Sequence, residues 1–127
     1  MILEHIALYT SDLEGMREFY EKYFNAIANE KYHNPKTGLQ TYFLTFDGGA
    51  RLEIMTKPEV QDISRTGLFV GLTHLAFHVG NKIKVDELTK KVVNAGFTLK
   101  SGPRTTGDGY YESCIFDPDG NEIEIIA

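Results

Sequence analysis

The chain has 127 residues, of which 13 are Lys or Arg and 18 are Asp or Glu, so its formal net charge is −5. This acidic balance, with no run of Lys or Arg, argues against nucleic acid or an anionic membrane surface as a partner. The single cysteine, Cys114, cannot form an internal disulfide, and no apolar run approaches the roughly 20 residues of a membrane span. The composition therefore predicts a soluble, cytoplasmic protein.

The first part of the chain reads as a strand, a helix and three further strands. Residues 2–9 alternate so that aliphatic side chains share one face, suited to burial beneath a helix, while His5 lies on the other. Ser11 and Glu14 match a capping box, which predicts a helix that ends near Phe24. The strand patterns that follow are joined by turn-forming residues and cover residues 28–33, 39–46 and 51–56.

The second part of the chain repeats this order after a connection that contains Gly and Pro. Asn81 is placed to cap a helix, and Gly96 to end it. We expect a strand at 72–79, the helix at 82–94, a short strand at 97–100, a loop at 101–109 and a hairpin of 110–116 with 122–126.

The two parts are copies of one unit. His5 returns as His74 after 69 residues (74 − 5), and Glu53 returns as Glu124 after 71 (124 − 53). Such a self-match indicates a duplicated unit, and half of this chain is too short for a stable core of its own. We predict an α+β fold, with two tandem βαβββ units forming a curved, cup-like mixed sheet and the helices outside. The boundaries are a single domain at 1–127, unit one at about 1–56, a linker at about 57–70 and unit two at about 71–127.

Four polar residues occupy matched positions on strands that are otherwise apolar: His5, Glu53, His74 and Glu124. Because side chains alternate along a strand, each should point away from its helix. Taken singly, such a His is more often a hydrogen-bonded core residue and such a Glu a solvated one. Two buried carboxylates at equivalent positions nevertheless require a cation. Two imidazoles and two carboxylates suit one divalent ion such as zinc, nickel, cobalt or manganese.

Five further residues are candidates for the lining of a small-molecule pocket. Tyr9 and His78 are equivalent in the duplication and lie on the ligand face, but each is about 13 Å along its strand from the neighbouring His, too far to bind the same ion. Arg104, Tyr110 and Tyr111 flank a Gly-containing turn and could close over a substrate. An interior Tyr or His, and a plain surface loop, are equally simple interpretations.

Three motifs contain Glu53, His74 and Glu124 in turn: Leu-Glu-Ile at 52–54, Thr-His-Leu-Ala-Phe at 73–77 and Asp-Pro-Asp-Gly-Asn-Glu-Ile-Glu-Ile at 117–125. With the His of the opening strand, they resemble the vicinal oxygen chelate superfamily, which includes glyoxalase, bleomycin resistance and dioxygenase proteins. The resemblance covers nearly the whole chain and is closest to glyoxalase I, or lactoylglutathione lyase. It implies that His5, Glu53, His74 and Glu124 hold a metal, nickel or zinc above all. It also implies a homodimer, with Glu124 as the catalytic base and Glu53 as the second candidate.

The activity implied by the resemblance is that of a lyase used in methylglyoxal detoxification. Glyoxalase I isomerises the hemithioacetal of a 2-oxoaldehyde and a thiol, usually glutathione, to a 2-hydroxyacyl thioester. Tyr9 stands near the place where bacterial glyoxalase I commonly carries an Arg that helps to hold glutathione, so the thiol stays open.

The same fold also serves in thiol transferases, epimerases, dioxygenases and metal-free antibiotic-binding proteins. Transferases and dioxygenases generally use two His and one Glu, so the presence of Glu53 favours glyoxalase I or an epimerase. A binding or resistance protein without catalytic activity is the alternative of a different class.

Overall fold

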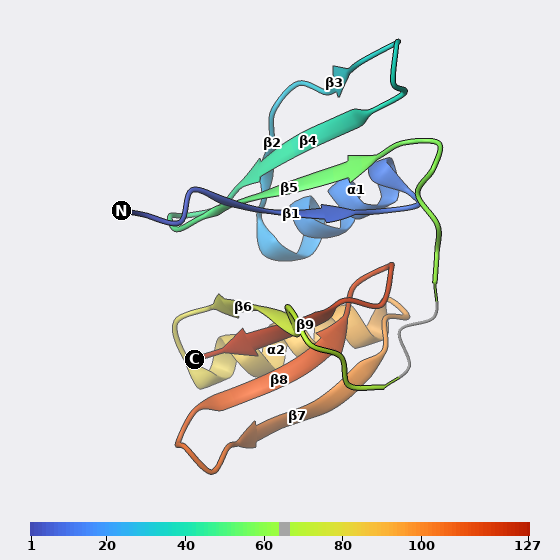
Figure 1. The fold of residues 1–127 in the computed structure, drawn as a ribbon. Coiled ribbons are helices and arrows are strands. Elements are labelled where there is room, and N and C mark those ends of the chain that lie inside the picture. The colour runs from blue at the N-terminus through green and yellow to red at the C-terminus, as the bar shows by residue number, and fades with distance from the viewer. Residues whose placement is uncertain (64–66) are drawn as a thin grey trace. The chain divides into compact units, whose positions relative to one another are not determined.

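The computed structural model describes residues 1–63 and 67–127, which form two compact units divided after residue 64 (Figure 1). Each unit contains one helix packed on one face of a β-sheet. Residues 64–66 of the predicted linker lie outside the described residues. No helix in the described ranges is long and apolar enough to cross a membrane.

The first unit is a mixed sheet with a single helix on it. Its strand order is β1-β5-β4-β2, with β3 also paired to β4; β1 and β5 run parallel and the other pairs antiparallel. The elements are β1 (His5–Tyr9), α1 (Leu13–Phe24), β2 (Ile27–Ala28), β3 (Tyr32–His33), β4 (Gln40–Thr45) and β5 (Arg51–Thr56).

The predicted strand at 28–33 is divided into β2 and β3. Between them the side chain of Asn29 accepts a hydrogen bond from the Phe43 amide at 2.8 Å, and the Asn29 amide donates to the Phe43 carbonyl at 3.1 Å. Asn29 thus satisfies the backbone of β4 where the regular ladder is interrupted. Residues 1–4, which the alternating pattern assigns in part to the first strand, precede β1, and Ile2 is exposed.

The core of the first unit lies between α1 and the sheet. Met16 and Tyr20 on α1, Leu44 on β4 and Ile54 on β5 have 0% exposure. Burial of each such side chain stabilises the fold by about 1.5–3 kcal/mol. The helical spacing of Met16 and Tyr20 and the alternation within the strands therefore direct the apolar side chains to one side of the sheet.

The start of α1 differs from the predicted capping box. The helix begins at Leu13, so its N-cap is Asp12, whose side chain accepts a hydrogen bond from the Gly15 amide at 3.0 Å. Ser11 lies one residue too early to cap the helix. With Asp12 as the N-cap, Glu14 lies only two residues after the cap and does not take the predicted capping role.

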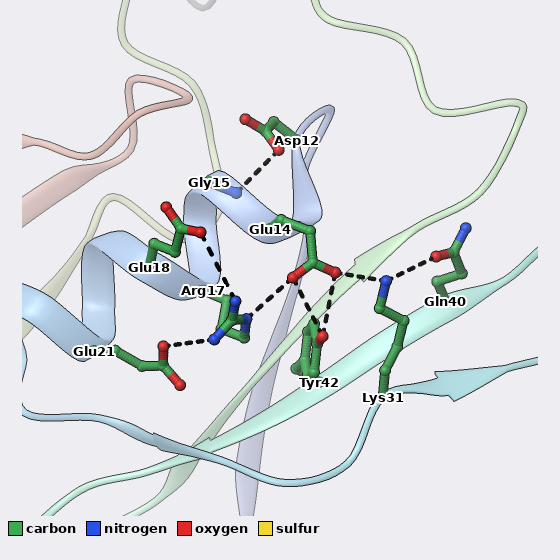
Figure 2. A network of polar contacts seen from close by, with 9 residues as sticks. All are labelled: Asp12, Glu14, Gly15, Arg17, Glu18, Glu21, Lys31, Gln40 and Tyr42. Atoms are coloured by element: carbon green, nitrogen blue, oxygen red, sulfur yellow. Dashed lines mark hydrogen bonds and ion pairs between the residues drawn. The ribbon is translucent and has the colours of Figure 1, made fainter.

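Glu14 instead holds α1 against the sheet through a polar network (Figure 2). Tyr42 on β4 donates its hydroxyl proton to Glu14, with O···O distances of 3.2 and 3.3 Å, and Lys31 forms an ion pair with the same carboxylate. Arg17 contacts Glu14 at 3.1 Å from the next turn of the helix. The pKa of the Glu14 carboxyl is lowered, and the hydrogen bond from Lys31 makes the largest contribution to this shift. This network belongs to the helix side of the sheet, so it serves the fold.

The second unit repeats the topology of the first. Its strand order is β6-β9-β8-β7, with β6 and β9 parallel and the other pairs antiparallel. Asn81 caps the helix by accepting a hydrogen bond from the Lys84 amide at 3.0 Å, as predicted. The α+β class and the tandem order of strands and helices are confirmed. The elements are β6 (His74–His78), α2 (Lys82–Asn94), β7 (Leu99–Thr105), β8 (Tyr111–Phe116) and β9 (Glu122–Ile126).

Strand β7 is longer than predicted. The Gly and Pro residues at 102 and 103 indicated a loop, but β7 continues through them to Thr105, with shifts in its register against β8. Strand β7 forms the edge of its sheet, where a Pro need not donate to a further strand. Gly102 adopts φ +81°, a conformation that favours glycine and fits such an irregularity.

Candidate metal centre

His5 and Glu53 lie on the same face of the first sheet, opposite α1, which we call the open face. In the parallel pairing of β1 with β5, Ala7 is in register with Glu53, and His5 precedes Ala7 by two residues. The neighbours of Glu53 on β5, Leu52 and Ile54, are buried on the helix side. The burial of these aliphatic residues fixes Glu53 on the open face because successive side chains alternate.

The two side chains approach each other within the first unit. The Nε2 atom of His5 lies 3.7 Å from Oε2 of Glu53. The side chain of His5 is 41% exposed and that of Glu53 17% exposed, so both remain accessible from the open face. His5 and Glu53 therefore lie next to each other on the face that the alternation along their strands predicts.

The second unit reproduces this pair. Ala76 on β6 is in register with Glu124 on β9, and His74 precedes Ala76 by two residues. The Nε2 atom of His74 lies 3.3 Å from Oε2 of Glu124, and the side chains are 38% and 24% exposed. In both units the same ring nitrogen faces the same kind of carboxylate at an equivalent position of the ladder.

The separation of the donor atoms fits two ligands of one metal ion. Ligand bonds of about 2.1 Å from His and carboxylate donors place adjacent donor atoms about 3.0–3.4 Å apart, for angles from a right angle to the tetrahedral value. The His74–Glu124 distance of 3.3 Å lies in this range. The His5–Glu53 distance of 3.7 Å requires a closure of a few tenths of an ångström. Each pair thus supplies one imidazole nitrogen and one carboxylate oxygen.

Glu122 lies with Glu124 on the face of the second sheet opposite α2, the open face of that unit, but has a different partner. Its carboxylate forms an ion pair with Nζ of Lys100. Lys100 therefore compensates the charge of Glu122, whereas Glu124 faces the imidazole ring of His74. Among residues 1–63 and 67–127, no group of three or more His, Cys, Asp or Glu side chains is arranged to hold a metal; each unit contributes a pair.

The outer nitrogen of each His is also engaged, by the residue that precedes it. Nδ1 of His5 contacts the carboxylate of Glu4, and Nδ1 of His74 lies 3.0 Å from the hydroxyl oxygen of Thr73. The pKa of the Glu4 carboxyl is held below its usual value. The hydrogen bond with His5 makes the largest contribution, and the neighbouring Arg51 lowers the pKa further. Neither partner is predicted from the sequence pattern, although both directly precede the duplicated His residues.

The five predicted pocket residues do not all lie on the open faces. Tyr9 and His78 lie on the open faces with His5 and His74 and are exposed, and Arg104 is paired in register with Glu112, 3.8 Å away at its closest. Tyr110 is exposed in the turn before β8. Tyr111 lies on the opposite face, where its hydroxyl donates to Asp86 of α2 at 2.7 Å. This helix contact places Tyr111 away from the face that carries Glu124.

Cys114 lies in the ladder beside Glu124 but does not have the character of a nucleophile. It is buried and in register with Glu124. Burial raises the pKa of the Cys114 thiol to about 11. At neutral pH the thiol therefore keeps its proton, and the reactive thiolate is absent.

Known proteins share both the sequence pattern and the fold. The Glyoxalase/Bleomycin resistance protein/Dioxygenase superfamily model matches residues 2–125. The uncharacterized protein YqjT of Bacillus subtilis (strain 168) is 30% identical over 132 residues, with 98% of each chain covered. The crystal structure of SMU.1112c has a TM-score of 0.81 and 26% identity, covering 100% of this chain and 98% of that one.

A further structure shares the fold at lower identity. The trypanothione-dependent glyoxalase I of Leishmania major has a TM-score of 0.80 and 19% identity, and the match covers 99% of this chain and 86% of the other. At this identity the likeness concerns the fold. The match of the family model over residues 2–125 shows the family: the chain belongs to the Glyoxalase/Bleomycin resistance protein/Dioxygenase superfamily.

Proposed function

We propose that this protein is a metal-dependent isomerase of the glyoxalase I type. The observation that carries the proposal is the pair of equivalent His–Glu contacts, His5 with Glu53 and His74 with Glu124, on the open faces of the two duplicated units. Duplication of a fold requires only apolar strand positions to recur. The recurrence of four polar donors indicates a function that all four serve.

The four donors are proposed to bind one divalent ion. One His–Glu pair offers two protein ligands, whereas a catalytic metal site usually has at least three. The two pairs together provide two nitrogens and two oxygens, a set that suits nickel or zinc and also cobalt or manganese. A bound ion would supply positive charge beside the two neighbouring oxygens of the substrate.

Glu124 is proposed to move the proton. Its carboxylate would take the proton from the carbon of the hemithioacetal that carries the hydroxyl and sulfur, and would return it to the adjacent carbonyl carbon. The hydroxyl proton of the first carbon would pass to the oxygen of that former carbonyl, so that the first carbon becomes the thioester carbonyl. This transfer converts the adduct of methylglyoxal into a 2-hydroxyacyl thioester without any net gain or loss of atoms. Glu53 is the second candidate, since it occupies the equivalent position in the first unit.

The residues of the proposed site do not specify which thiol forms the substrate adduct. Tyr9, an exposed phenol on the open face of β1, stands near the place where bacterial glyoxalase I commonly has an arginine. The Leishmania major glyoxalase I is trypanothione-dependent, which supports testing thiols other than glutathione. We further propose that the protein is a cytoplasmic homodimer that acts on this small molecule and on neither nucleic acid nor membranes.

The proposed reaction is tested by assaying thioester formation. The protein is loaded separately with nickel and zinc and is given methylglyoxal with glutathione, with another low-molecular-weight thiol and with no thiol. We expect metal-dependent formation of a 2-hydroxyacyl thioester with at least one thiol, and no product after chelation. Metal binding without turnover of any adduct would contradict the isomerase and would favour an epimerase or transferase. Absence of both would favour a small-molecule-binding protein.

A further inference from the structure

His5 takes part in a ring of contacts with Glu4, Arg51 and Phe43 within the first unit. The Oε2 atom of Glu4 contacts Nδ1 of His5, while Oε1 of Glu4 accepts a hydrogen bond from Nε of Arg51 at 2.6 Å. The Arg51 guanidinium lies 4.2 Å from the centre of the Phe43 ring. The Phe43 ring in turn meets the His5 ring edge-on, with 5.4 Å between centroids and an angle of 86°. Glu4 is thus held on one side by Arg51 and contacts His5 on the other.

The contact with Glu4 favours a proton on one particular ring nitrogen of His5. An ionised carboxylate only accepts hydrogen bonds, so Nδ1 of a neutral His5 must be the donor to Glu4. The Nε2 atom is then unprotonated, with its lone pair available on the side where Glu53 lies 3.7 Å away. The backbone amide of Arg51 also donates to the Glu4 carbonyl at 3.0 Å, which fixes the main chain of Glu4 beside β5.

We propose that Glu4, held by Arg51, is a positioning residue that fixes His5 in the tautomer and orientation required of a metal ligand. This inference rests on the proposed function, since it assigns His5 to the same metal. Outer carboxylates of this kind orient metal-ligating His residues and raise their basicity, and their loss typically lowers metal affinity by about 10–100-fold. The Glu4 side chain is 53% exposed, so we expect an effect near the lower limit of that range.

In the second unit, Thr73 occupies the position that Glu4 has in the first. The partner of His74 is the hydroxyl of Thr73, which can either donate or accept a hydrogen bond. Thr73 therefore does not dictate the tautomer of His74 as a carboxylate does. Glu4 should consequently matter more for metal binding than Thr73, although the two residues occupy equivalent places in the duplication.

Two measurements on the same variants test this role. Nitrogen-15 chemical shifts of the His5 ring in the metal-free protein report its tautomer, and competition against a chelator reports the affinity for zinc. The variants are Glu4→Ala, Glu4→Gln and Thr73→Val. Glu18→Ala serves as the control, because it removes a carboxylate that is 70% exposed on α1 in the same unit.

We expect the wild type to show His5 protonated on Nδ1, and Glu4→Ala to shift the ring toward a mixture and to weaken zinc binding about tenfold. Glu4→Gln retains an accepting oxygen and should recover part of both effects, while Glu18→Ala and Thr73→Val should change the His5 tautomer little. Unchanged tautomer and affinity in Glu4→Ala, with zinc still bound by the wild type, would overturn the role of Glu4. A wild type that binds no zinc or nickel would overturn the proposed function instead, and the tautomer in the metal-free protein would then decide the role of Glu4.

Discussion

Replacing Glu124 by glutamine is expected to lower the rate of hemithioacetal isomerisation by about 10²–10⁴-fold, the range for loss of a general base. The substitution Glu124→Gln preserves the shape of the side chain but removes the carboxylate that would accept the proton. Ile123 and Ile125, which flank it on β9, are fully buried, so the strand should keep its place. The rate is measured at saturating metal, because Glu124 is also proposed as a ligand.

Two companion variants separate the base from the ligand. Glu53→Gln should weaken metal binding and should lose less activity than Glu124→Gln once metal is saturating, since Glu53 is the second candidate for the base. Glu87→Gln makes the same change of charge at an exposed position of α2 and should behave as the wild type. If Glu124→Gln retains nearly full activity at saturating metal, Glu124 is not the base.

The substitution Gly102→Ala is expected to lower the free energy of unfolding by about 3 kcal/mol or more. Gly102 has φ +81°, and a Cβ there would lie 2.5 Å from the Glu112 carbonyl oxygen and 2.9 Å from Cα of Ser113. Both are backbone atoms of β8, so relief of the clash would require β7 to move from its partner. The left-handed conformation costs an alanine about 1–2 kcal/mol, and overpacking adds about 1–3 kcal/mol.

Gly109→Ala is the matched control for this prediction. Gly109 has φ +95° in the turn that follows β7, but a Cβ there would meet no atom within 4 Å. It should therefore show the conformational cost alone, about 1–2 kcal/mol. Urea unfolding of both variants measures the difference. Equal losses of stability would show that the close approach of β7 to β8 at Gly102 has no energetic weight.

The relative positions within each His–Glu pair could be predicted from sequence because they depend on two simple regularities. Alternation along a strand assigns His5 and Glu53 to the face opposite Leu52 and Ile54, and the duplication assigns the same relation to the second unit. Neither regularity depends on loops or on the exact ends of strands.

The role of Glu14 and the length of β7 were predicted wrongly, because both depend on contacts between residues that are distant in sequence. Nothing local indicates that Glu14 would be engaged by Lys31 and Tyr42, which left the capping pattern as the simplest interpretation. Strand β7 continues past Gly102 because β8 supplies its partner, and this pairing overrides the local tendency of Gly and Pro to form a loop. In both cases tertiary contacts override the local sequence preference.

The contacts of Tyr111 and Glu4 could be found only from the positions of their side chains in the structure. Tyr110 and Tyr111 are adjacent in sequence, yet Tyr111 turns toward α2 and bonds to Asp86, whereas Tyr110 is exposed in the turn. Strict alternation over residues 2–9 would place Glu4 on the helix-facing side, but Glu4 precedes β1 and its carboxylate contacts His5 and Arg51. The strand period of two does not extend to residues that lie just outside the strand.

The most direct test of the account is the amount of divalent metal that the purified protein binds. After dialysis against nickel or zinc and removal of free ions, we predict about one tightly bound ion for each set of four ligands. The free energy of unfolding should rise by about 2.7 kcal/mol when the free ion is at one hundred times its Kd, and a chelator should reverse this gain. His5→Ala and His74→Ala should each lower the metal content. A protein that retains no nickel or zinc, and whose Tm neither ion changes, would contradict the account.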